Sequence, residues 1–584
     1  MSEELVRDEI VLPAEPVPDG PVTVSPVEAL LDWLAAHAVS IEEAVGWGLL
    51  AALALVSRLL FLGSPPLNLE EGRRALEAYT LLQSGRVTYE GAPILSNLIS
   101  LTFTLFTAGD LQARLAPAVC GVLLVLTPLL LRPVLGGWWS LSAGICLASS
   151  TILLSASRSV SPAVPAMLCV AVTAASSWRF GIVHERGWLV ATVVAALVGI
   201  GIDTSFTLGL ATLILAYAIA EGEIFGRAAW WEPVAKHGRW ALAIGVGVAV
   251  ILDTRLLTSP GGIQVGLIDP LIRWTDEIAR GAGLTAPLLI GLLDGSLVIL
   301  ALIGLIEYPR YPRAVRFLGT WLLVSLTLAS LMRMPDPRYL SQPMLPAGLL
   351  AGFGLLALVS WIRQAGSSRT TVIALVGLVP VITTAFQINA GLRNNLSPWS
   401  ASGVVLVAGL LLVALLAFNV LRGLELSAAF ATWLLVLLAF GSISGAGRTL
   451  EARGDDRGQL ADQSVATAEM RNIRETALTW YRAMPDGPLP VDPGLRPLVG
   501  WALRDIPTVR YSPEAASVAG PRLLSDPPVS VSPDTKTIRY IVGYSADWGS
   551  LTLQPGRLWR WALNRETLVT LRPYAIVVVQ PAGS

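Results

Sequence analysis

The chain has 584 residues, of which 53% are hydrophobic and only 14% are charged, and its mean hydropathy is +0.63. These values exclude an ordinary soluble protein, because apolar runs of at least about 18 residues recur along the first three quarters of the chain and each can cross a bilayer. The formal net charge of −1 gives no indication of a nucleic-acid partner. The sequence therefore predicts an α-helical polytopic membrane protein.

The first segment, residues 1–42, is predicted to be a cytoplasmic tail. Residues 1–25 are acidic and rich in proline, and no positively charged region precedes the first apolar run. This pattern does not match a cleaved signal peptide, and it is typical of a short disordered tail.

The membrane region is expected over residues 43–445, with about thirteen spans. We predict them at 44–62, 114–132, 138–156, 162–180, 188–203, 205–221, 239–255, 286–306, 315–333, 340–362, 370–389, 401–421 and 425–444. The pair 188–203 and 205–221 has a second interpretation as one long bent span, since only Asp203 and Thr204 mark the break.

The orientation follows from arginine in the short loops, which accumulates on the cytoplasmic side of membrane proteins. Placing the N-terminus inside puts the arginine-rich loops, such as the one with Arg310, Arg313 and Arg316, in the cytoplasm. We therefore predict an integral plasma membrane protein with a cytoplasmic N-terminus. The segments expected outside are 63–113, 256–285, 334–339, 390–400 and 445–584.

The first external loop, residues 63–113, is the most informative part of the chain, because long ordered loops are usually functional. The stretch EEGRRALEAYTLLQSG, which begins at Glu70, predicts an amphipathic helix in the membrane interface. Glu70 and Glu71 fall in its first turn, where the helix dipole favours carboxylates. Two interpretations stay open: the glutamates cap the helix, or they do acid/base chemistry. The apolar stretch 94–109 is interpreted as an interfacial or re-entrant helix.

Arginines gather near the outward ends of the predicted spans, against the usual charge bias. Any one of them alone is commonly a side chain that reaches out of the membrane toward water. Together, guanidinium groups at this depth suit a phosphate or pyrophosphate, which they bind through paired hydrogen bonds, and a lipid phosphate lies at this depth. The residues are Arg58, Arg73, Arg74, Arg158, Arg255, Arg333 and Arg338.

The last segment, residues 446–584, differs from the rest in being polar and rich in Pro, Gly and Arg. A helical stretch near 464–484 is followed by β-like runs at 537–544 and 574–580. This composition predicts a small extracytoplasmic soluble α+β domain.

The residues indicate no definite cofactor. Cys120, Cys146 and Cys169 all fall in apolar runs and are interpreted as small buried hydrophobic residues. No group of His, Cys and carboxylate residues has the spacing of a zinc site. Use of a divalent metal ion is left open.

Several motifs in order resemble the GT-C superfamily of membrane glycosyltransferases, which includes the dolichyl-phosphate-mannose protein mannosyltransferases and the lipid A aminoarabinose transferases. The matching stretches are NLEEGRRALEAYTLLQSG, the run from YEGAPILSN to ARLAPAVCGVLLVLTPLLLRPVLG, SASRSVSPA and PDPRYLSQPMLPAGLLAG. WALRDIPTVRY and RLWRWALNRE near the C-terminus are similar to a flippase-associated branch of that superfamily.

The resemblance implies transfer of a sugar from a polyprenyl-phosphate carrier to an acceptor glycan, lipid or protein at the outer membrane face. Glu70 is then the general base, with Glu71 as the second acidic residue of the motif. The C-terminal domain covers the site and selects the acceptor. The residues implied for the phosphate and its lipid are Arg58, Arg158, Arg333, Arg338, Tyr339 and Tyr89.

Two departures from the family pattern leave a second hypothesis open. The first acidic residue is usually Asp, whereas this chain has Glu70, and the turn SASRSVSPA has Ala163 where a second Asp is usual. The rival hypothesis is a catalytically degenerate GT-C-like scaffold, or a lipid-carrier-binding partner of a membrane assembly. A secondary transporter fits less well, because the notable charges lie at span ends rather than near the midplane.

Overall fold

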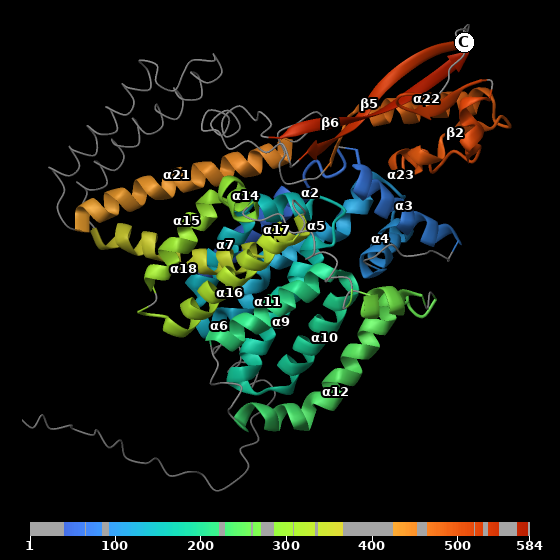
Figure 1. Cartoon of the computed structure of the whole chain (residues 1–584). Helices are drawn as coiled ribbons and strands as arrows, with labels where there is room; N and C mark the ends of the chain where they lie inside the picture. The colour runs from blue at the N-terminus through green and yellow to red at the C-terminus, as the bar shows by residue number, and fades with distance from the viewer. Residues whose placement is uncertain are drawn as a thin grey trace, which may run out of the picture. The chain divides into compact units, whose positions relative to one another are not determined.

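The computed structural model describes residues 40–64, 66–84, 93–220, 228–258, 261–269, 272, 285–307, 309–332, 337–365, 424–451, 464–518, 520–528, 535–547 and 569–581. Helices dominate the described residues as far as residue 451, and a small sheet follows near the C-terminus (Figure 1). This arrangement confirms the predicted fold class, a polytopic helical protein with a C-terminal α+β region.

The helices of the membrane region follow the apolar runs of the sequence. Two helices of the first external loop, α3 (Leu69–Ser84) and α4 (Pro93–Leu105), precede most of them. The others are α2 (Ile41–Leu59), α5 (Asp110–Leu126), α6 (Arg132–Leu135), α7 (Gly137–Ser149), α8 (Thr151–Ser157), α9 (Ala163–Val183), α10 (Arg186–Ile202), α11 (Thr204–Ala220), α12 (Ala228–Asp253), α14 (Thr285–Leu293), α15 (Gly295–Gly304), α16 (Pro312–Leu331), α17 (Pro337–Leu340), α18 (Met344–Ala365) and α21 (Leu424–Glu451).

Five helical segments among the described residues are long and apolar enough to cross a membrane, and two bent helix pairs raise the number to as many as seven. The five are 110–135, 163–183, 234–253, 312–331 and 338–363. The predicted spans 370–389 and 401–421 lie outside the described residues, so the total of about thirteen remains a prediction. The chain is an integral membrane protein on this evidence of length and composition.

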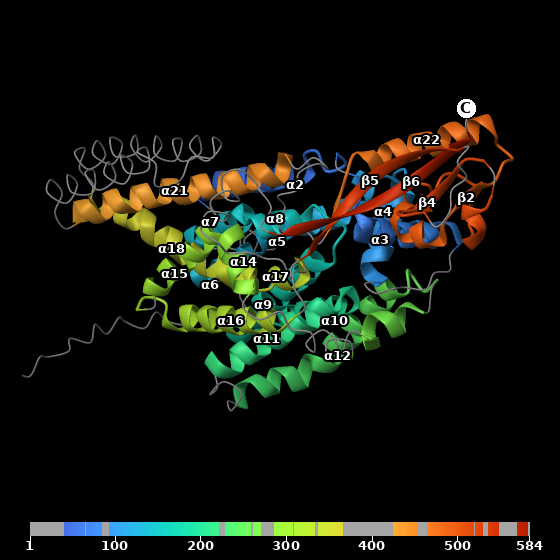
Figure 2. The ribbon, with the colours of Figure 1, turned by 45° about the horizontal axis from the view of Figure 1, so that its top comes forward.

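Two local predictions have clear outcomes. The segment expected to be interfacial or re-entrant forms α4, which has 13 residues and at about 20 Å is too short to cross a bilayer. The break at Asp203 is confirmed: α10 ends at Ile202, Asp203 is extended, and α11 begins at Thr204. Helix α10 also packs along α12, as Figures 1 and 2 both show.

Glycines allow two of the membrane helices to approach very closely. A Cβ atom at Gly354 in α18 would lie 1.9 Å from the carbonyl oxygen of Leu300 in α15. Reciprocally, a Cβ atom at Gly304 would lie 2.2 Å from the carbonyl oxygen of Leu350. Small residues at such crossings are the usual means of packing helices in membranes, where lipid provides no hydrophobic drive for association.

One buried carboxylate joins the two bent helix pairs. Asp294 lies at the 97° bend between α14 and α15, and its oxygens accept hydrogen bonds from Ser150 Oγ (2.6 Å) and the backbone N–H of Thr151 (2.6 Å) and Ile152 (3.2 Å). These donors begin α8, just after the 67° bend between α7 and α8. Asp294 therefore satisfies N–H groups that the break in one bent pair leaves without a helical partner.

The C-terminal region forms one six-stranded sheet with the order β1-β5-β6-β4-β2-β3. Strand β2 is parallel to β3 and β4, whereas the pairs β1–β5, β5–β6 and β4–β6 are antiparallel. Helix α22 (Glu469–Ala483) packs on β5, beside the long β5–β6 pair (Figure 2). The strands are β1 (Ser464–Ala466), β2 (Leu489–Val491), β3 (Val509–Tyr511), β4 (Arg522–Ser525), β5 (Thr535–Asp547) and β6 (Thr570–Pro581).

Trp501, which follows the short helix α23 (Arg496–Val499), attaches this region to the first external loop. Its indole N–H donates to Asp110 Oδ1 (2.8 Å), and its ring stacks on Phe103 with centroids 5.6 Å apart. The guanidinium of Arg504 lies 3.7 Å from the centre of the Trp501 ring and also donates to the carbonyl of Ala108 (2.7 Å). A buried aromatic anchor with a hydrogen-bonded N–H is a strong form of docking contact.

Candidate active site

Helix α3 begins with a reciprocal cap. The backbone N–H of Glu71 donates to Asn68 Oδ1 (3.0 Å), and the backbone N–H of Asn68 donates to Glu71 Oε2 (3.0 Å). This is the geometry of a capping box, in which the residue before the helix and the third residue within it satisfy each other's N–H groups. The capping interpretation therefore applies to Glu71.

The Glu71 carboxylate is also one half of a buried ion pair. Arg114 of α5 donates from Nε to Oε1 (2.8 Å) and from Nη2 to Oε2 (2.6 Å), and each side chain is only 5% exposed. The backbone N–H of Val160 adds a further hydrogen bond to Oε1 (2.9 Å). Glu71 thus ties together α3, α5 and the turn before α9, and its oxygens are occupied by protein donors.

The surroundings of Glu71 determine its charge. Burial by itself raises the pKa of this carboxyl group, but the Arg114 guanidinium and the N–H groups of Asn68 and Val160 outweigh burial and lower the pKa overall. Glu71 is therefore ionised at neutral pH and is a poor proton acceptor, since its lone pairs are engaged.

The lowered pKa predicts a pH dependence of stability with a definite sign. A carboxyl group with a lower pKa in the folded state stabilises the fold above its unfolded pKa, about 4.3 for Glu, and loses that contribution as the pH falls below it. We expect Glu71→Gln to lower the midpoint of thermal unfolding (Tm) at pH 7, and the difference from wild type to narrow below about pH 4. Thermal unfolding of both proteins in detergent between about pH 4 and pH 7 measures this difference in Tm. A Tm difference that is constant with pH would contradict the lowered pKa of Glu71.

Glu70 lies in a different environment from its neighbour. Its side chain is 45% exposed, and Oε2 accepts a hydrogen bond from Arg73 Nη2 at 2.8 Å, one helical turn later. The carboxylate is therefore accessible, unlike that of Glu71. Of the two predicted catalytic glutamates, only Glu70 has an exposed carboxylate.

Three of the predicted arginines converge around the start of α3. Arg74 donates to the carbonyl of Val160 (2.8 Å), in the same turn that contacts Glu71. Arg158 begins that turn and donates to backbone carbonyls at the end of α2, those of Ser57 (2.9 Å) and Leu60 (2.8 Å) among them. Arg58 is 1% exposed at the same end of α2. A guanidinium at the C-terminal end of a helix is favoured by the helix dipole.

This cluster has more positive than negative charge. Arg58 and Arg158 donate to backbone or hydroxyl oxygens, and within the described part of the chain neither makes an ion pair with a carboxylate. Burial, and next the charge of Arg114, lower the pKa of Arg158 to about 10, so it remains charged at neutral pH. Two guanidinium groups without a counter-charge form a suitable environment for a phosphate.

The remaining predicted residues lie elsewhere or outside the described part. Arg338 of α17 is 3.5 Å from Asp203 and beside the ring of Tyr339, whose side chain is buried. Helix α17, which carries them, packs on α8 and α9. Arg333 and Tyr89 lie outside the described residues.

Sequence reasoning missed Arg114 as part of this site. The signal was available, because an arginine within the apolar run 113–126 needs a counter-charge. Its partner Glu71 is 43 residues away in sequence, and no local spacing connects the two residues. In the sequence, Asp253 is one more charge near the end of an apolar run, whereas in the structure its carboxylate is buried at the end of α12.

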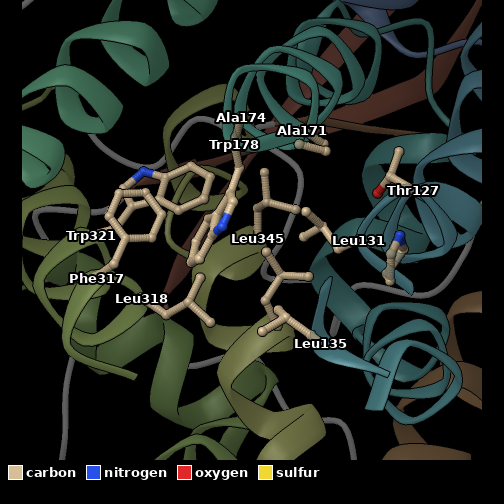
Figure 3. A pocket seen from close by; sticks show the side chains of 13 residues that line it. Thr127, Leu131, Leu135, Ala171, Ala174, Trp178, Phe317, Leu318, Trp321 and Leu345 are labelled. Atoms are coloured by element: carbon tan, nitrogen blue, oxygen red, sulfur yellow. The ribbon is translucent and has the colours of Figure 1, made fainter. Parts of the chain in front are cut away.

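A separate apolar pocket lies between the membrane helices (Figure 3). It is lined by Trp178 of α9, Phe317 and Trp321 of α16, and Leu345 of α18, among others. Among the described residues that line the pocket, Thr127 is the one with a hydroxyl group and none is charged. The pocket lies roughly 20 Å along α5 from Arg114, which separates it from the cluster at α3. Its chemistry suits an apolar chain.

The described part of the chain was searched for side chains that could bind a metal ion together. Among these residues, no group of three or more His, Cys, Asp or Glu side chains is placed to hold a metal ion.

The chain is similar to known membrane proteins in part of its sequence and in its fold. Residues 90–251 match the model of the dolichyl-phosphate-mannose-protein mannosyltransferase family. The structure is similar to that of ArnT from Cupriavidus metallidurans bound to undecaprenyl phosphate, with a TM-score of 0.56 and 18% identity over 92% of this chain and 99% of that one. The apo structure of the same protein gives a TM-score of 0.55, with 18% identity over 92% of this chain and 98% of that one.

No curated protein sequence matches the chain as a relative. At 18% identity, the likeness to ArnT establishes the fold. The chain is thus a membrane protein with the GT-C fold, and the resemblance of its motifs to that superfamily is confirmed at the level of the fold.

Proposed function

We propose that the protein is a membrane glycosyltransferase that moves a sugar from a polyprenyl-phosphate carrier to an acceptor at the outer face of the membrane. The observation that carries the proposal is the pair Arg58 and Arg158, two guanidinium groups without a carboxylate partner in the described chain, beside the start of α3. The match to the mannosyltransferase family and the likeness to a protein solved with undecaprenyl phosphate support it.

The reaction proposed is a single displacement. The oxygen of an acceptor hydroxyl attacks C1 of the sugar while the bond from C1 to the phosphate oxygen breaks, and its electron pair stays on the lipid phosphate. Arg58 and Arg158 stabilise the charge that develops on that phosphate. The proton of the hydroxyl passes to the carboxylate of Glu70, which is accessible and pairs with Arg73.

Glu71 has a positioning role in this proposal. Its bonds to Arg114 and to the N–H of Val160 fix α3 against α5 and against the turn that carries Arg158. Small errors in such an arrangement are costly, since a displacement of about 1 Å can cost on the order of 100-fold in rate. Arg73, Arg74, Arg333, Arg338, Tyr339 and Tyr89 remain candidates for contacts to the carrier lipid.

The orientation is part of the proposal. The N-terminus is cytoplasmic, and α3, the arginine cluster and the sheet region face outward, as the arginine distribution of the loops indicates. The contacts of Trp501 with Phe103 and Asp110 support a role for the C-terminal region beside the site, where it would select the acceptor glycan, lipid or protein. The apolar pocket of Figure 3 suits part of the carrier's apolar chain.

A second candidate is a degenerate scaffold that binds the lipid carrier without turnover. The observation that favours it is Ala163, a fully buried residue without a polar group where the family pattern has a second acid. Such a protein would still bind the lipid phosphate through Arg58 and Arg158, but it would not catalyse transfer of the sugar.

Lipid binding and turnover, measured together, test both candidates. We expect purified protein in nanodiscs to bind polyprenyl phosphate, and Arg158→Gln to weaken binding by about 10- to 100-fold, since a charge-assisted hydrogen bond is lost. Arg482→Gln, which changes an exposed arginine on α22, is the matched control and should bind like wild type. Release of polyprenyl phosphate from a panel of its sugar conjugates reports turnover. Binding without turnover of any conjugate would favour the scaffold, and failure of wild type to bind the lipid would refute both candidates.

A further inference from the structure

Trp501 belongs to the core beneath α3 rather than to the core of its own region. Its neighbours Ala502 and Leu503 are buried in the core that joins α22 to the sheet, and the Trp501 side chain, 6% exposed, lies in a different one. The other buried residues of that second core are Leu67, Ala75, Ala78, Leu95, Ile99, Phe103, Ala113 and Val160. Among the described residues after 446, Trp501 is the only one buried there, so the C-terminal region completes the packing under α3.

The Trp501 side chain contacts three successive helices. Its ring stacks on Phe103 of α4, with centroids 5.6 Å apart, and meets Tyr79 of α3 edge to face, with centroids 6.3 Å apart. Its N–H donates to Asp110 Oδ1 in the first turn of α5 (2.8 Å). Because one rigid ring makes all three contacts, it relates the positions of α3, α4 and α5 to one another.

The backbone that carries Trp501 lies on one face of α3. A Cβ atom at Gly72 would lie 3.6 Å from Trp501 Cβ, and a Cβ atom at Gly500 would lie 2.7 Å from Leu76 Cδ2. Gly72, Leu76 and Tyr79 have the spacing of residues on one side of a helix. Residues 500 and 501 therefore cover this side of α3.

Two contacts fix the rotation of the first turn of α3. Successive residues point about 100° apart around a helix, so Glu70, Glu71 and Gly72 face three directions. Glu71 is held by Arg114, and Gly72 faces Trp501. The third direction is that of Glu70, whose side chain is 45% exposed. The direction of the Glu70 carboxylate therefore depends on the Trp501 contact as well as on the buried ion pair.

The C-terminal region also holds the segments that flank these helices. Arg471 of α22 donates to the carbonyls of Gly63 (3.3 Å) and Ser64, which lie between α2 and α3. Arg504 lies on the Trp501 ring and donates to the carbonyl of Ala108 (2.7 Å), just before α5. The contact at Trp501 is thus the centre of a longer junction between the two regions.

We propose that Trp501 is a positioning residue for Glu70: it holds the first turn of α3 at the rotation from which the Glu70 carboxylate receives the proton of the acceptor hydroxyl. This inference rests on the proposed glycosyltransferase function. It goes beyond that function because it makes the C-terminal region part of the catalytic geometry. Arg58 and Arg158 are held by oxygens of α2 and its end, so binding of the lipid phosphate should not depend on Trp501.

The first measurement compares turnover with lipid affinity. Trp501→Leu keeps an apolar side chain but removes the ring and its N–H. It should lower kcat for release of polyprenyl phosphate from the conjugate that wild type uses by about 10- to 100-fold, because a displacement of about 1 Å has an effect of this order. The affinity for polyprenyl phosphate should stay within about threefold of wild type. Trp501→Phe keeps a ring against Phe103 and Tyr79, and its kcat should lie within about fivefold of wild type.

A double-mutant cycle in kcat distinguishes positioning of Glu70 from a general structural role. If Trp501 acts through the Glu70 carboxylate, adding Trp501→Leu to Glu70→Gln should lower the residual kcat by less than about threefold. An equal loss in both backgrounds would overturn the proposal. Val578→Ala, in the core of the sheet region, is the matched control: it should lower Tm and keep kcat within about threefold of wild type.

Hydrogen exchange of the full chain in nanodiscs tests the position of α3 without relying on turnover. Trp501→Leu should raise the exchange rates of amides in α3 by about tenfold or more, while α9 and α16 keep their protection. Val578→Ala should leave the exchange of α3 as in wild type. Unchanged protection of α3 in Trp501→Leu would overturn the proposal.

The outcomes separate this inference from the proposed function. If wild type turns over a conjugate but the cycle is additive, or α3 keeps its protection in Trp501→Leu, the assignment of Trp501 fails alone. If wild type turns over no conjugate, the proposed transferase function fails, and the positioning of a base by Trp501 fails with it.

Discussion

Arg114→Met is expected to destabilise the protein by about 3–5 kcal/mol, the largest stability effect of any single change at the site. The substitution leaves the Glu71 carboxylate, 5% exposed, without its bidentate partner, and an uncompensated buried charge is strongly unfavourable. The carbonyls of Leu62 (3.0 Å) and Pro66 (3.3 Å) lose a donor as well. Denaturant unfolding in detergent measures the loss.

A double-mutant cycle separates two contributions to this loss of stability: the loss of the ion pair itself, and the cost of leaving the Glu71 carboxylate buried without its partner. Arg114→Met combined with Glu71→Leu should recover a large part of the stability, because replacing a whole buried ion pair with apolar groups is often nearly neutral. Arg73→Met is the matched control one turn along α3, since its partner Glu70 is 45% exposed and such a pair is worth less than about 1 kcal/mol. Equal losses for Arg73→Met and Arg114→Met would disprove the assigned importance of burial.

The sequence was sufficient to predict those helices and strands that form because of the residues within their own segment. Apolar runs long enough to cross a bilayer predicted α5, α9, α12, α16 and α18, and the β-like runs at 537–544 and 574–580 predicted β5 and β6. Helix α3 follows from the apolar face of the segment after Glu70. Each of these predictions uses only residues within one element, and this is why they could be made without knowledge of the tertiary structure.

The division of roles between Glu70 and Glu71 could not be predicted in this way. Adjacent residues on a helix point about 100° apart, so one faces the protein while the next faces away. Which of the two is buried depends on where Arg114 and Val160 are brought by the fold. The sequence therefore left capping and catalysis open for both residues, whereas the structure assigns the cap and the buried pair to Glu71.

The burial of Asp253 is a second feature that could not be predicted from the sequence. In the sequence it is one more charge at the end of an apolar run, a position where exposed charges are common. Its burial depends on Gly201 and Gly266, which lie in two other segments and approach it closely because they have no side chain. Only the packing of three segments makes the residue unusual.

Glu70→Gln is expected to have the largest effect on activity. If Glu70 accepts the proton of the acceptor hydroxyl, the amide can no longer do so, and turnover of the sugar conjugate should fall by about 100- to 10,000-fold. The affinity for polyprenyl phosphate and the thermal stability should change little, because the carboxylate is exposed and its pair with Arg73 contributes less than about 1 kcal/mol. Release of polyprenyl phosphate under saturating donor measures turnover, with a binding titration on the same samples.

Two further variants test whether the loss of turnover is due to the Glu70 carboxylate itself. Glu77→Gln changes a glutamate two turns along the same helix, at a side chain bonded to Ser96, and should keep turnover within a few-fold of wild type. Glu70→Asp keeps the carboxylate but shortens its reach, and partial activity would show that the carboxylate is needed and that its position matters. Turnover by Glu70→Gln equal to that of wild type would remove Glu70 as the base. Because Glu71 is fully engaged by Arg114, Asn68 and Val160, the proton would then have to pass to a group outside the first turn of α3.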